Sequence, residues 1–285
     1  MIKDTDLEAS TKNNAPCDMG YNPLRANISV EKRQKLENEM YMERTRADEI
    51  FYPCNNAVLT KVGVEVLRVI NAHVKDENAL IGKETARFPC ERTIIELCAG
   101  DGQFLRRYPY WNLNAQRYIG IEIDESLVYA YYHPPHHFPK ATMVQGDVLQ
   151  IDAILKKLKG KINAPVFLIL QNSLGTLKGD YQELLKTLRG LFNRYERASL
   201  IISLYRQNAL YDWGLLSYWY GAEVNGWPYD KNSLKKGTFK SVTGYESKWW
   251  SDEEIEEIVS RIDSAKLVEE KITGVYWVGR FFAKV

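Results

Sequence analysis

The fold is decided by the stretch TIIELCAGDGQFLRRY, residues 93–108. It begins as an apolar, β-branched run that carries Glu96, passes through a turn of small residues and continues into a predicted helix. Gly100 and Gly102 lack a Cβ atom, so another group can approach the backbone of this turn closely. A strand, a glycine turn and a helix in this order predict the ligand-binding turn of an open α/β sheet.

Strand-like and helix-like segments alternate after Arg92. The strand-like runs are continuous and apolar, as in buried parallel strands that are covered by helices on both faces. They are TIIELC, RYIGIEI, ATMVQG, APVFLIL and ASLIISLY, and the helices between them start near residues 102, 125, 148 and 180. This rhythm predicts a doubly wound α/β sheet with right-handed crossovers. Ser251 begins a capped helix, and two apolar runs around Gly274 predict a terminal antiparallel hairpin.

The chain divides into three predicted parts. Residues 1–28 are polar and interrupted by proline and glycine, which predicts a flexible arm. Residues 29–92 carry two helical patterns, the second over about Ala57 to Val74, and form a predicted helical cap. Residues 93–285 form the sheet domain. Within it, residues 206–248 interrupt the rhythm with aromatic and turn-forming content, which indicates a functional insertion after the fifth strand.

Composition and charge narrow the function classes. The 285 residues are 45% apolar and 26% charged, and the formal net charge of +1 gives no overall attraction to nucleic acid or anionic membranes. The first residues are polar, and no apolar run approaches the ~20 residues needed to cross a bilayer. We therefore expect a cytoplasmic protein without a membrane segment. The sequence does not indicate the oligomeric state.

Cysteine and histidine spacing does not predict a metal site. The four cysteines are widely spaced and form no Cys-x-x-Cys pair, which favours neither zinc binding nor a disulfide framework. His133, His136 and His137 in HPPHHF are separated by prolines and have no acidic neighbour, so we interpret them as part of a loop.

Small and polar residues stand where the next three apolar runs end. Glu122 ends the second run about 20 residues beyond the glycine turn, the distance at which a carboxylate binds ribose hydroxyls in a dinucleotide-type fold. Gly146 and Asp147 end the third run, and QNSLG, residues 171–175, ends the fourth. Because the carboxyl ends of parallel strands meet at one sheet edge, these residues are predicted to lie together at a ligand site.

A family resemblance rests on four motifs in order, ELCAGDGQF, GIEID, QGDV and LQNSLGTL. Together they resemble the successive motifs of the Rossmann-like (class I) S-adenosylmethionine-dependent methyltransferases. The terminal hairpin is similar to that family's seventh strand, which is inserted antiparallel beside the sixth. The resemblance covers roughly residues 93–285. It implies a seven-stranded sheet, mostly parallel with an antiparallel last strand, and S-adenosyl-L-methionine as the cofactor.

The resemblance also implies roles for individual residues. Glu96 and the two glycines shape the methionine and ribose pocket, Glu122 binds the ribose hydroxyls, and Asp147 accepts from the adenine amino group. Cys98 departs from the pattern, which often has a glycine there, and could abut the cofactor. The full set of predicted cofactor-binding residues is Glu96, Cys98, Ala99, Gly100, Gly102, Glu122, Ile123, Gly146, Asp147, Val148, Gln171, Asn172 and Ser173.

Other ligands and acceptors compete with this interpretation. A nicotinamide dinucleotide fingerprint requires a small residue three positions beyond Gly102, where this chain has Leu105. QNSLG resembles the corresponding segment of small-molecule N-methyltransferases rather than the Asn-Pro-Pro-Tyr of nucleobase methyltransferases. A small amine or amino-acid-like acceptor is therefore favoured. The alternatives are a protein or RNA acceptor, transfer of an aminopropyl-type group from a sulfonium nucleoside, and a catalytically silent cofactor-binding protein.

Three residues are candidates for binding or activating the methyl acceptor. Tyr205 and Arg206 follow the fifth strand, where the aromatic insertion is expected to cover the active-site end of the sheet as a lid. Arg206 could bind an acceptor carboxylate through two hydrogen bonds, although an ordinary surface ion pair is the alternative. Two roles stay open for Tyr52 in the predicted cap: closing over the site, and sealing the cap to the sheet. The insertion aromatics, such as Trp213, have packing on the core as their alternative role.

Overall fold

A computed structural model describes residues 57–88, 91–102, 104–105, 115–132, 140–177, 180–214, 231–240 and 246–284. In two of these ranges the side chains are described only in part, from residue 68 onward in the first and from residue 233 onward in 231–240. The strands are β1 (Arg92–Leu97), β2 (Ala115–Glu122), β3 (Ala141–Gln145), β4 (Val166–Ile169), β5 (Ser199–Tyr205), β6 (Thr238–Lys240), β7 (Glu246–Lys248), β8 (Ala265–Ile272) and β9 (Tyr276–Ala283). The principal helices are α3 (Ala57–Arg87), α5 (Glu125–Tyr132), α6 (Ile151–Lys157), α7 (Tyr181–Arg194), α9 (Lys231–Leu234) and α10 (Asp252–Arg261).

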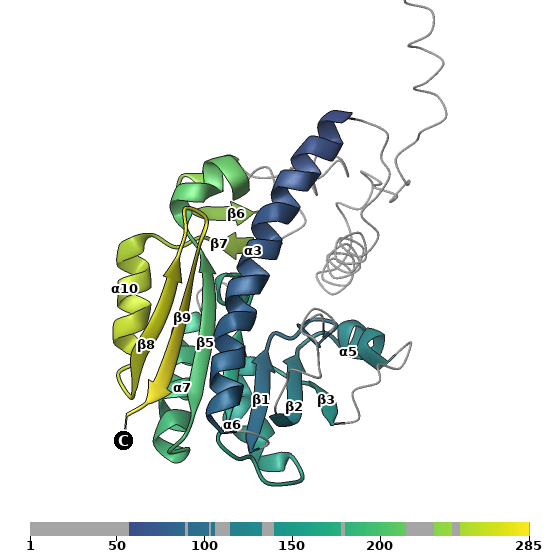
Figure 1. Ribbon diagram of the computed structural model, residues 1–285, viewed down its shortest axis with the longest axis vertical. Coiled ribbons are helices and arrows are strands. Elements are labelled where there is room, and N and C mark those ends of the chain that lie inside the picture. Colours follow the sequence, from purple (N-terminus) through teal and green to yellow (C-terminus); the bar gives the residue numbers. More distant parts are fainter. Residues whose placement is uncertain are drawn as a thin grey trace, which may run out of the picture.

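The main sheet has seven strands in the order β3-β2-β1-β4-β5-β9-β8 (Figure 1). Strands β1 to β5 pair in parallel, and β9 lies antiparallel between β5 and β8. The predicted fold class is thus confirmed, including the antiparallel hairpin around Gly274. The chain winds outward from β1 to β3, then returns to β4 on the other side of β1. This reversal places a topological switch point between β1 and β4.

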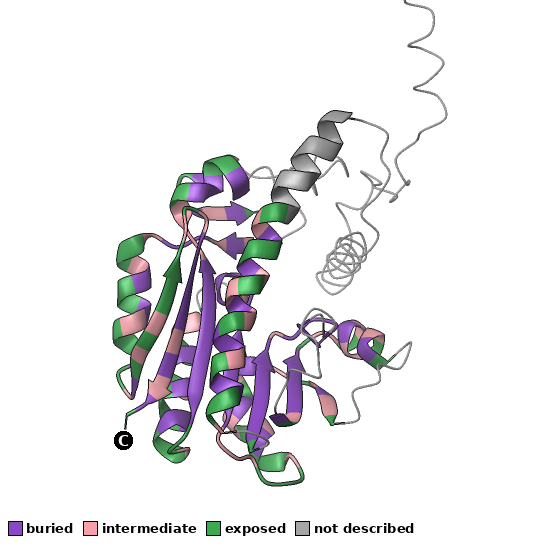
Figure 2. Ribbon diagram, viewed as in Figure 1, coloured by how far each residue is buried: buried purple, intermediate pink, exposed green. Residues whose placement is uncertain are grey.

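The central strands β1, β4 and β5 are buried on both faces, as continuous apolar strands require, whereas the edge strand β8 is largely exposed (Figure 2). In β4, Phe167 and Ile169 join the cluster that packs against α6, α7 and α10. The alternate residues Val166 and Leu168 join the cluster on the opposite face, with contributions from α3 and α5. The period of two along a strand therefore supplies one residue to each helical layer in turn. Glu96 follows Ile94 on the face that α3 covers.

Helix α3 is longer than the sequence pattern predicts. We expected an end near Val74, but the helix continues to Arg87 and runs across one face of the sheet, where it contacts β5 and β9 (Figure 1). The predicted end is wrong because polar side chains occupy several positions of the buried stripe and hide its period. The buried positions in the described part of the helix are Ile70, His73, Glu77, Leu80, Ile81, Glu84 and Thr85, at the three- and four-residue spacing of one helical face.

A buried ionic network fixes the C-terminal end of α3. Glu84 and Arg92 are both fully buried, and Arg92 Nη2 donates to Glu84 Oε2 at 2.7 Å. Arg280 from β9 donates to the other oxygen of the same carboxylate. Arg92 Nη1 also donates to the Arg197 carbonyl at 2.6 Å. Burial lowers the pKa of Arg92 to about 10, an effect that the nearby carboxylate of Glu84 opposes.

The insertion after β5 is described in part. Its first residues form the short helical turns η5 (Gln207–Ala209) and η6 (Leu210–Gly214). Its last residues form α9 and a two-stranded antiparallel sheet, β6 with β7, that the sequence analysis does not predict. The predicted cap at Ser251 is confirmed, since its side chain accepts from Glu254 N and the Glu254 side chain accepts from Ser251 N.

The division into arm, cap and sheet domain remains a prediction. Residues 1–56 lie outside the described residues, so the arm and the first helix of the cap are not compared with the structure. The loop with His133, His136 and His137 also lies outside them. None of the described helices has both the length and the apolar character needed to span a membrane.

Candidate active site

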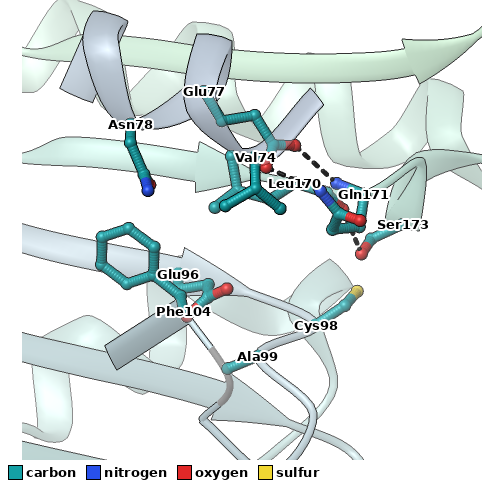
Figure 3. A pocket seen from close by; sticks show the side chains of 10 residues that line it. All are labelled: Val74, Glu77, Asn78, Glu96, Cys98, Ala99, Phe104, Leu170, Gln171 and Ser173. Carbon is teal, nitrogen blue, oxygen red and sulfur yellow. Dashed lines mark hydrogen bonds between the residues drawn. The ribbon is translucent and has the colours of Figure 1, made fainter. Parts of the chain in front are cut away.

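A cavity lies at the switch point, between the carboxyl ends of β1 and β4 and underneath α3 (Figure 3). This is the place where open α/β sheets bind ligands, because the connections leave β1 and β4 in opposite directions and open a crevice. The side chains that line the cavity are Val74, Glu77, Asn78, Glu96, Cys98, Ala99, Phe104, Leu170, Gln171 and Ser173. Five of the predicted cofactor-binding residues are among them, namely Glu96, Cys98, Ala99, Gln171 and Ser173.

The loops that follow β1, β2 and β3 are joined by hydrogen bonds. Gly100 N donates to Glu122 Oε2 at 2.8 Å, and Ala99 N donates to the Ile121 carbonyl at 3.0 Å. Gly146 N donates to the Glu122 carbonyl at 2.9 Å. The fold therefore brings the first three predicted motifs together along one edge of the sheet, with Glu122 at their centre.

Glu122 keeps hydrogen-bonding capacity beyond these backbone contacts. Its side chain is 7% exposed, and its second oxygen accepts from Asp124 N at 3.1 Å. Burial raises the pKa of Glu122, while the backbone N–H donors of Asp124 and Gly100 oppose that effect. A carboxylate has about four lone-pair sites, and the backbone N–H groups of Gly100, Asp124 and Ile123 do not use all of them, so capacity for a hydroxyl donor is left. Ile123 beside it is 60% exposed and offers an apolar surface at the same edge.

The glycine turn owes part of its composition to packing within the protein. Gly100 and Gly102 have φ angles of 57° and 79°, in the left-handed region. A Cβ atom on Gly102 would lie 2.5 Å from the ring of Tyr131 on α5. Tyr131 is thus the group that approaches this glycine. Cys98 has a φ of 58° without being glycine, and burial raises the pKa of its thiol.

The loop after β3 positions Asp147 by a local cap. Asp147 Oδ1 accepts from Leu149 N at 2.9 Å and begins the short turn η3 (Val148–Gln150). A Cβ on Gly146 would lie 2.6 Å from Ile154 of α6, so this glycine also serves packing. The Val148 side chain is buried in the core and can contribute to a ligand site through its backbone.

The loop after β4 turns through two consecutive left-handed residues. Gln171 and Asn172 have φ angles of 53° and 62°. Such conformations cost about 1–3 kcal/mol each in residues other than glycine and persist where surrounding contacts impose them. The Ser173 hydroxyl donates to the Leu170 carbonyl at 2.7 Å and closes the turn.

Asn172 is buried, and its side chain is engaged within the protein. Its Nδ2 donates to the Lys248 carbonyl at 2.9 Å and to Ser247 Oγ at 3.3 Å. Its Oδ1 accepts from Tyr205 N at 3.1 Å and from Trp250 Nε1 at 3.0 Å. We therefore assign this predicted ligand a role in joining β4, β5 and β7.

Glu96 presents a buried carboxyl to the cavity. It is 6% exposed and accepts a hydrogen bond from the Tyr118 hydroxyl on β2. Burial raises the pKa of Glu96 to about 8, and the neighbouring carboxylates of Glu77, Asp101 and Glu122 act in the same direction. This residue can therefore change its charge near neutral pH, inside the cavity.

Glu77 is a cavity residue that the sequence analysis misses. Its Oε1 accepts from Ser203 Oγ at 2.5 Å and from Gln171 N at 3.0 Å, and its Oε2 accepts from Gln171 Nε2 at 2.7 Å. His73 Nε2 lies 3.2 Å from Glu77 Oε1 on the same helix. The available signal was the recurrence of His73, Glu77 and Glu84 at helical spacing, which indicates polar residues on a buried face.

Of the three predicted acceptor residues, the structure describes Tyr205 and Arg206. Tyr52 lies outside the described residues. The Tyr205 ring is half-buried and packs against His73, Trp213 and Trp249, at centroid distances of 5.4, 5.5 and 4.8 Å. Trp213 and Trp249 are buried in a cluster that includes Ile70 of α3. For this described part of the insertion, the packing interpretation therefore holds.

Arg206 makes an ion pair, the alternative that the sequence leaves open for it. Its Nη2 donates to both carboxylate oxygens of Asp252, at 2.8 and 2.7 Å, and its Nε donates to Asp252 Oδ1 at 3.0 Å. Its Nη1 donates to the Thr273 carbonyl at 2.7 Å. The guanidinium group that we expected to bind an acceptor carboxylate is thus already engaged by the start of α10 and by the β8–β9 turn.

The strand order, with β9 antiparallel between β5 and β8, is that of the class I S-adenosylmethionine-dependent methyltransferase fold. No protein-family model matches the sequence, and no curated protein matches it. Structural similarity is correspondingly distant, and it concerns the fold alone.

Three solved structures illustrate that similarity. The CcbJ methyltransferase from Streptomyces caelestis is 13% identical, with 73% of this chain and 90% of that chain covered at a TM-score of 0.48. An S-adenosylmethionine-dependent methyltransferase from Clostridium acetobutylicum is 8% identical. The match covers 78% of this chain and 98% of that chain, at a TM-score of 0.48. The N-methyltransferase NodS from Bradyrhizobium japonicum, in complex with S-adenosyl-l-homocysteine, is 9% identical. The match covers 73% of this chain and 86% of that chain, at a TM-score of 0.43. Likenesses at this level carry no argument about activity.

Proposed function

We propose that the protein is an S-adenosylmethionine-dependent methyltransferase that acts on a small amine or amino-acid-like acceptor. The observation that carries this proposal is the junction at Glu122, whose carboxylate accepts from Gly100 N while the loops after β1, β2 and β3 meet around it. A nucleoside requires such an arrangement, because its ribose hydroxyls need acceptors and its ring needs an apolar surface beside them.

The residues present fit this cofactor. Glu122 can accept from the ribose hydroxyls, with exposed Ile123 beside it for the adenine ring. Asp147 can accept from the adenine amino group, since its Oδ1 and Oδ2 together offer more lone-pair sites than the cap to Leu149 uses. The cavity lined by Glu96, Cys98 and the β4 loop would hold the amino-acid end.

The bound sulfonium supplies an electrophilic methyl group, and the chain has little covalent work to do. Its main tasks are to align the acceptor with that methyl group and to exclude water. Helix α3 covers the cavity through Val74, Glu77 and Asn78, which restricts access to it. A covered cavity favours a small acceptor over a protein or RNA, in agreement with the QNSLG segment.

Calorimetry with S-adenosylhomocysteine tests the cofactor assignment. Glu122→Gln should weaken binding by about 1.5–3 kcal/mol, because it removes the charge from hydrogen bonds to the ribose. Glu125→Gln, an exposed substitution on the adjoining helix, should leave the affinity unchanged. Equal affinity of wild type and Glu122→Gln would contradict the assignment.

The acceptor class requires a separate measurement. Wild-type protein incubated with methyl-labelled S-adenosylmethionine and a fractionated pool of small amines and amino acids should transfer label to a small product. Transfer confined to added protein or RNA fractions would contradict the acceptor class while leaving the cofactor assignment intact.

A further inference from the structure

The Gln171 side chain is held in one orientation by Glu77. A carboxylate can only accept hydrogen bonds, so the amide group of Gln171 must turn its nitrogen toward Glu77, as the 2.7 Å contact from Nε2 to Oε2 shows (Figure 3). The amide oxygen is thereby directed away from Glu77, on a side chain that lines the cavity. The orientation of this amide follows from the chemistry of its partner.

The backbone around Gln171 is fixed by the same partner. Gln171 N donates to Glu77 Oε1 at 3.0 Å and to Ser203 Oγ at 2.8 Å, and Ser203 in turn donates to Glu77. These contacts hold Gln171 at a φ of 53°, which a glutamine rarely adopts. Glu77 is 3% exposed, so these hydrogen bonds are buried and the groups that form them have little freedom to rearrange.

We infer that Glu77 is a positioning residue that makes Gln171 present an acceptor oxygen to the cavity, and that the group bound there is an ammonium. This inference rests on the proposed function, which supplies such a group at the amino-acid end of the cofactor. The carboxylate of Glu77 also lines the cavity, which favours a cation over a neutral donor there.

The substitution Glu77→Gln changes the side-chain volume little, but it can place an N–H donor where Glu77 Oε2 accepts from Gln171 Nε2. The introduced amide oxygen can still accept from Gln171 N and Ser203 Oγ, so the backbone turn keeps its support. The introduced amide nitrogen, however, needs an acceptor and attracts the oxygen of Gln171. The Gln171 amide should therefore turn its nitrogen toward the cavity, where it opposes an ammonium group.

Two nucleosides make the test specific. S-Adenosylhomocysteine carries the ammonium group, whereas 5′-methylthioadenosine shares its adenosine and thioether but lacks the amino-acid end. In calorimetry, Glu77→Gln should weaken S-adenosylhomocysteine binding by at least about tenfold and leave 5′-methylthioadenosine within about twofold of wild type. Asp76→Asn, one residue earlier on α3, should change neither affinity, since its amide oxygen can still accept from the Tyr276 hydroxyl.

Two further variants separate positioning from a merely structural role. Gln171→Ala should lose as much S-adenosylhomocysteine affinity as Glu77→Gln, and combining the two should cost nothing further, because the residues act as a unit. The reciprocal exchange Glu77→Gln with Gln171→Glu restores an acceptor oxygen toward the cavity and should recover most of the affinity.

The outcomes are distinguishable. Selective loss of S-adenosylhomocysteine affinity, with recovery in the reciprocal exchange, supports the inference. Unchanged affinity in Glu77→Gln, or an equal loss for both nucleosides, overturns it while the proposed function stands. Failure of the wild type to bind either nucleoside contradicts the proposed function and overturns this inference with it.

Discussion

Buried carboxyl groups mark the candidate site at the scale of single residues. Glu77, Glu96 and Glu122 are each less than a tenth exposed, and each lies at or beside the edge of the sheet where the cavity opens. Burying a carboxylate costs free energy unless donors or cations compensate it. Here the donors are backbone N–H groups, a tyrosine and a serine hydroxyl, and a glutamine amide.

Glu96 predicts a specific pH dependence of stability. Its pKa in the folded protein is about 8, against an ordinary value near 4.5, so the folded state retains a proton that the unfolded state loses between these values. The stabilising contribution is therefore full below about pH 4.5 and is lost as the pH rises toward 8. Glu96→Gln stays neutral, and its melting temperature should fall less than that of wild type between pH 5 and 8.5.

Thermal unfolding of both proteins at several pH values checks this expectation. Glu122, whose pKa is also raised by burial, contributes in the same direction to wild type and variant. The difference between the two curves therefore reports Glu96. Parallel curves would show that Glu96 is ionised in the folded protein across this range.

Arg206 is expected to stabilise the protein without contributing to the cofactor site. Arg206→Ala removes the pair with Asp252 and the bond to the Thr273 carbonyl, which should lower the free energy of unfolding by about 1 kcal/mol. S-Adenosylhomocysteine affinity should not change. Denaturant titration checks the loss of stability, and calorimetry checks the affinity. A tenfold loss of affinity would contradict the prediction and indicate that Arg206 contributes to the cofactor site.

At the scale of elements, Asn172 is the junction between the sheet and the insertion. Asn172→Ala leaves the Lys248 carbonyl, Tyr205 N and Trp250 Nε1 without this partner, and it places alanine in a left-handed conformation. We expect the free energy of unfolding to fall by about 3 kcal/mol or more, with faster hydrogen exchange in β6 and β7.

An exposed asparagine provides the matched control for that prediction. Asn193→Ala on α7 makes the same chemical change at an exposed position and should lower stability little or not at all. If Asn172→Ala behaves like Asn193→Ala in denaturant titration, then Asn172 does not join the insertion to the sheet.

Local signals in the sequence account for much of the fold. The capping box at Ser251 and the turn around Gly274 are each specified within a few neighbouring residues, and both predictions are confirmed. The strand ends at Glu122 and Gly146 were predictable for a similar reason, since apolar runs end where polar and small residues begin. These features need no knowledge of distant partners.

Pairings between distant residues could not be predicted in this way. The continuation of α3 depends on Glu84, which is buried against Arg92 and Arg280 from elsewhere in the chain. Arg206 is engaged by Asp252, 46 residues further along. Because a single sequence does not show which side chains meet, polar residues on a buried helix face look like the end of the helix.

At the scale of the whole molecule, the sheet and α3 together form one binding edge. The switch point opens a crevice between β1 and β4, the loop after β1 lines one side of it through Cys98 and Ala99, and α3 covers the other (Figures 1 and 3). Glu122 holds the loop after β1 from the neighbouring strand β2. We propose that a nucleoside with an amino-acid tail lies along this edge.

A crystal structure of the protein grown with S-adenosylhomocysteine tests that claim most directly. We expect ligand density along the carboxyl edge, with the ribose hydroxyls on Glu122, the adenine beside Ile123 and Asp147, and the ammonium group near Gln171. Density for the nucleoside elsewhere on the molecule, or an edge filled by the protein's own side chains in the presence of saturating ligand, would contradict it.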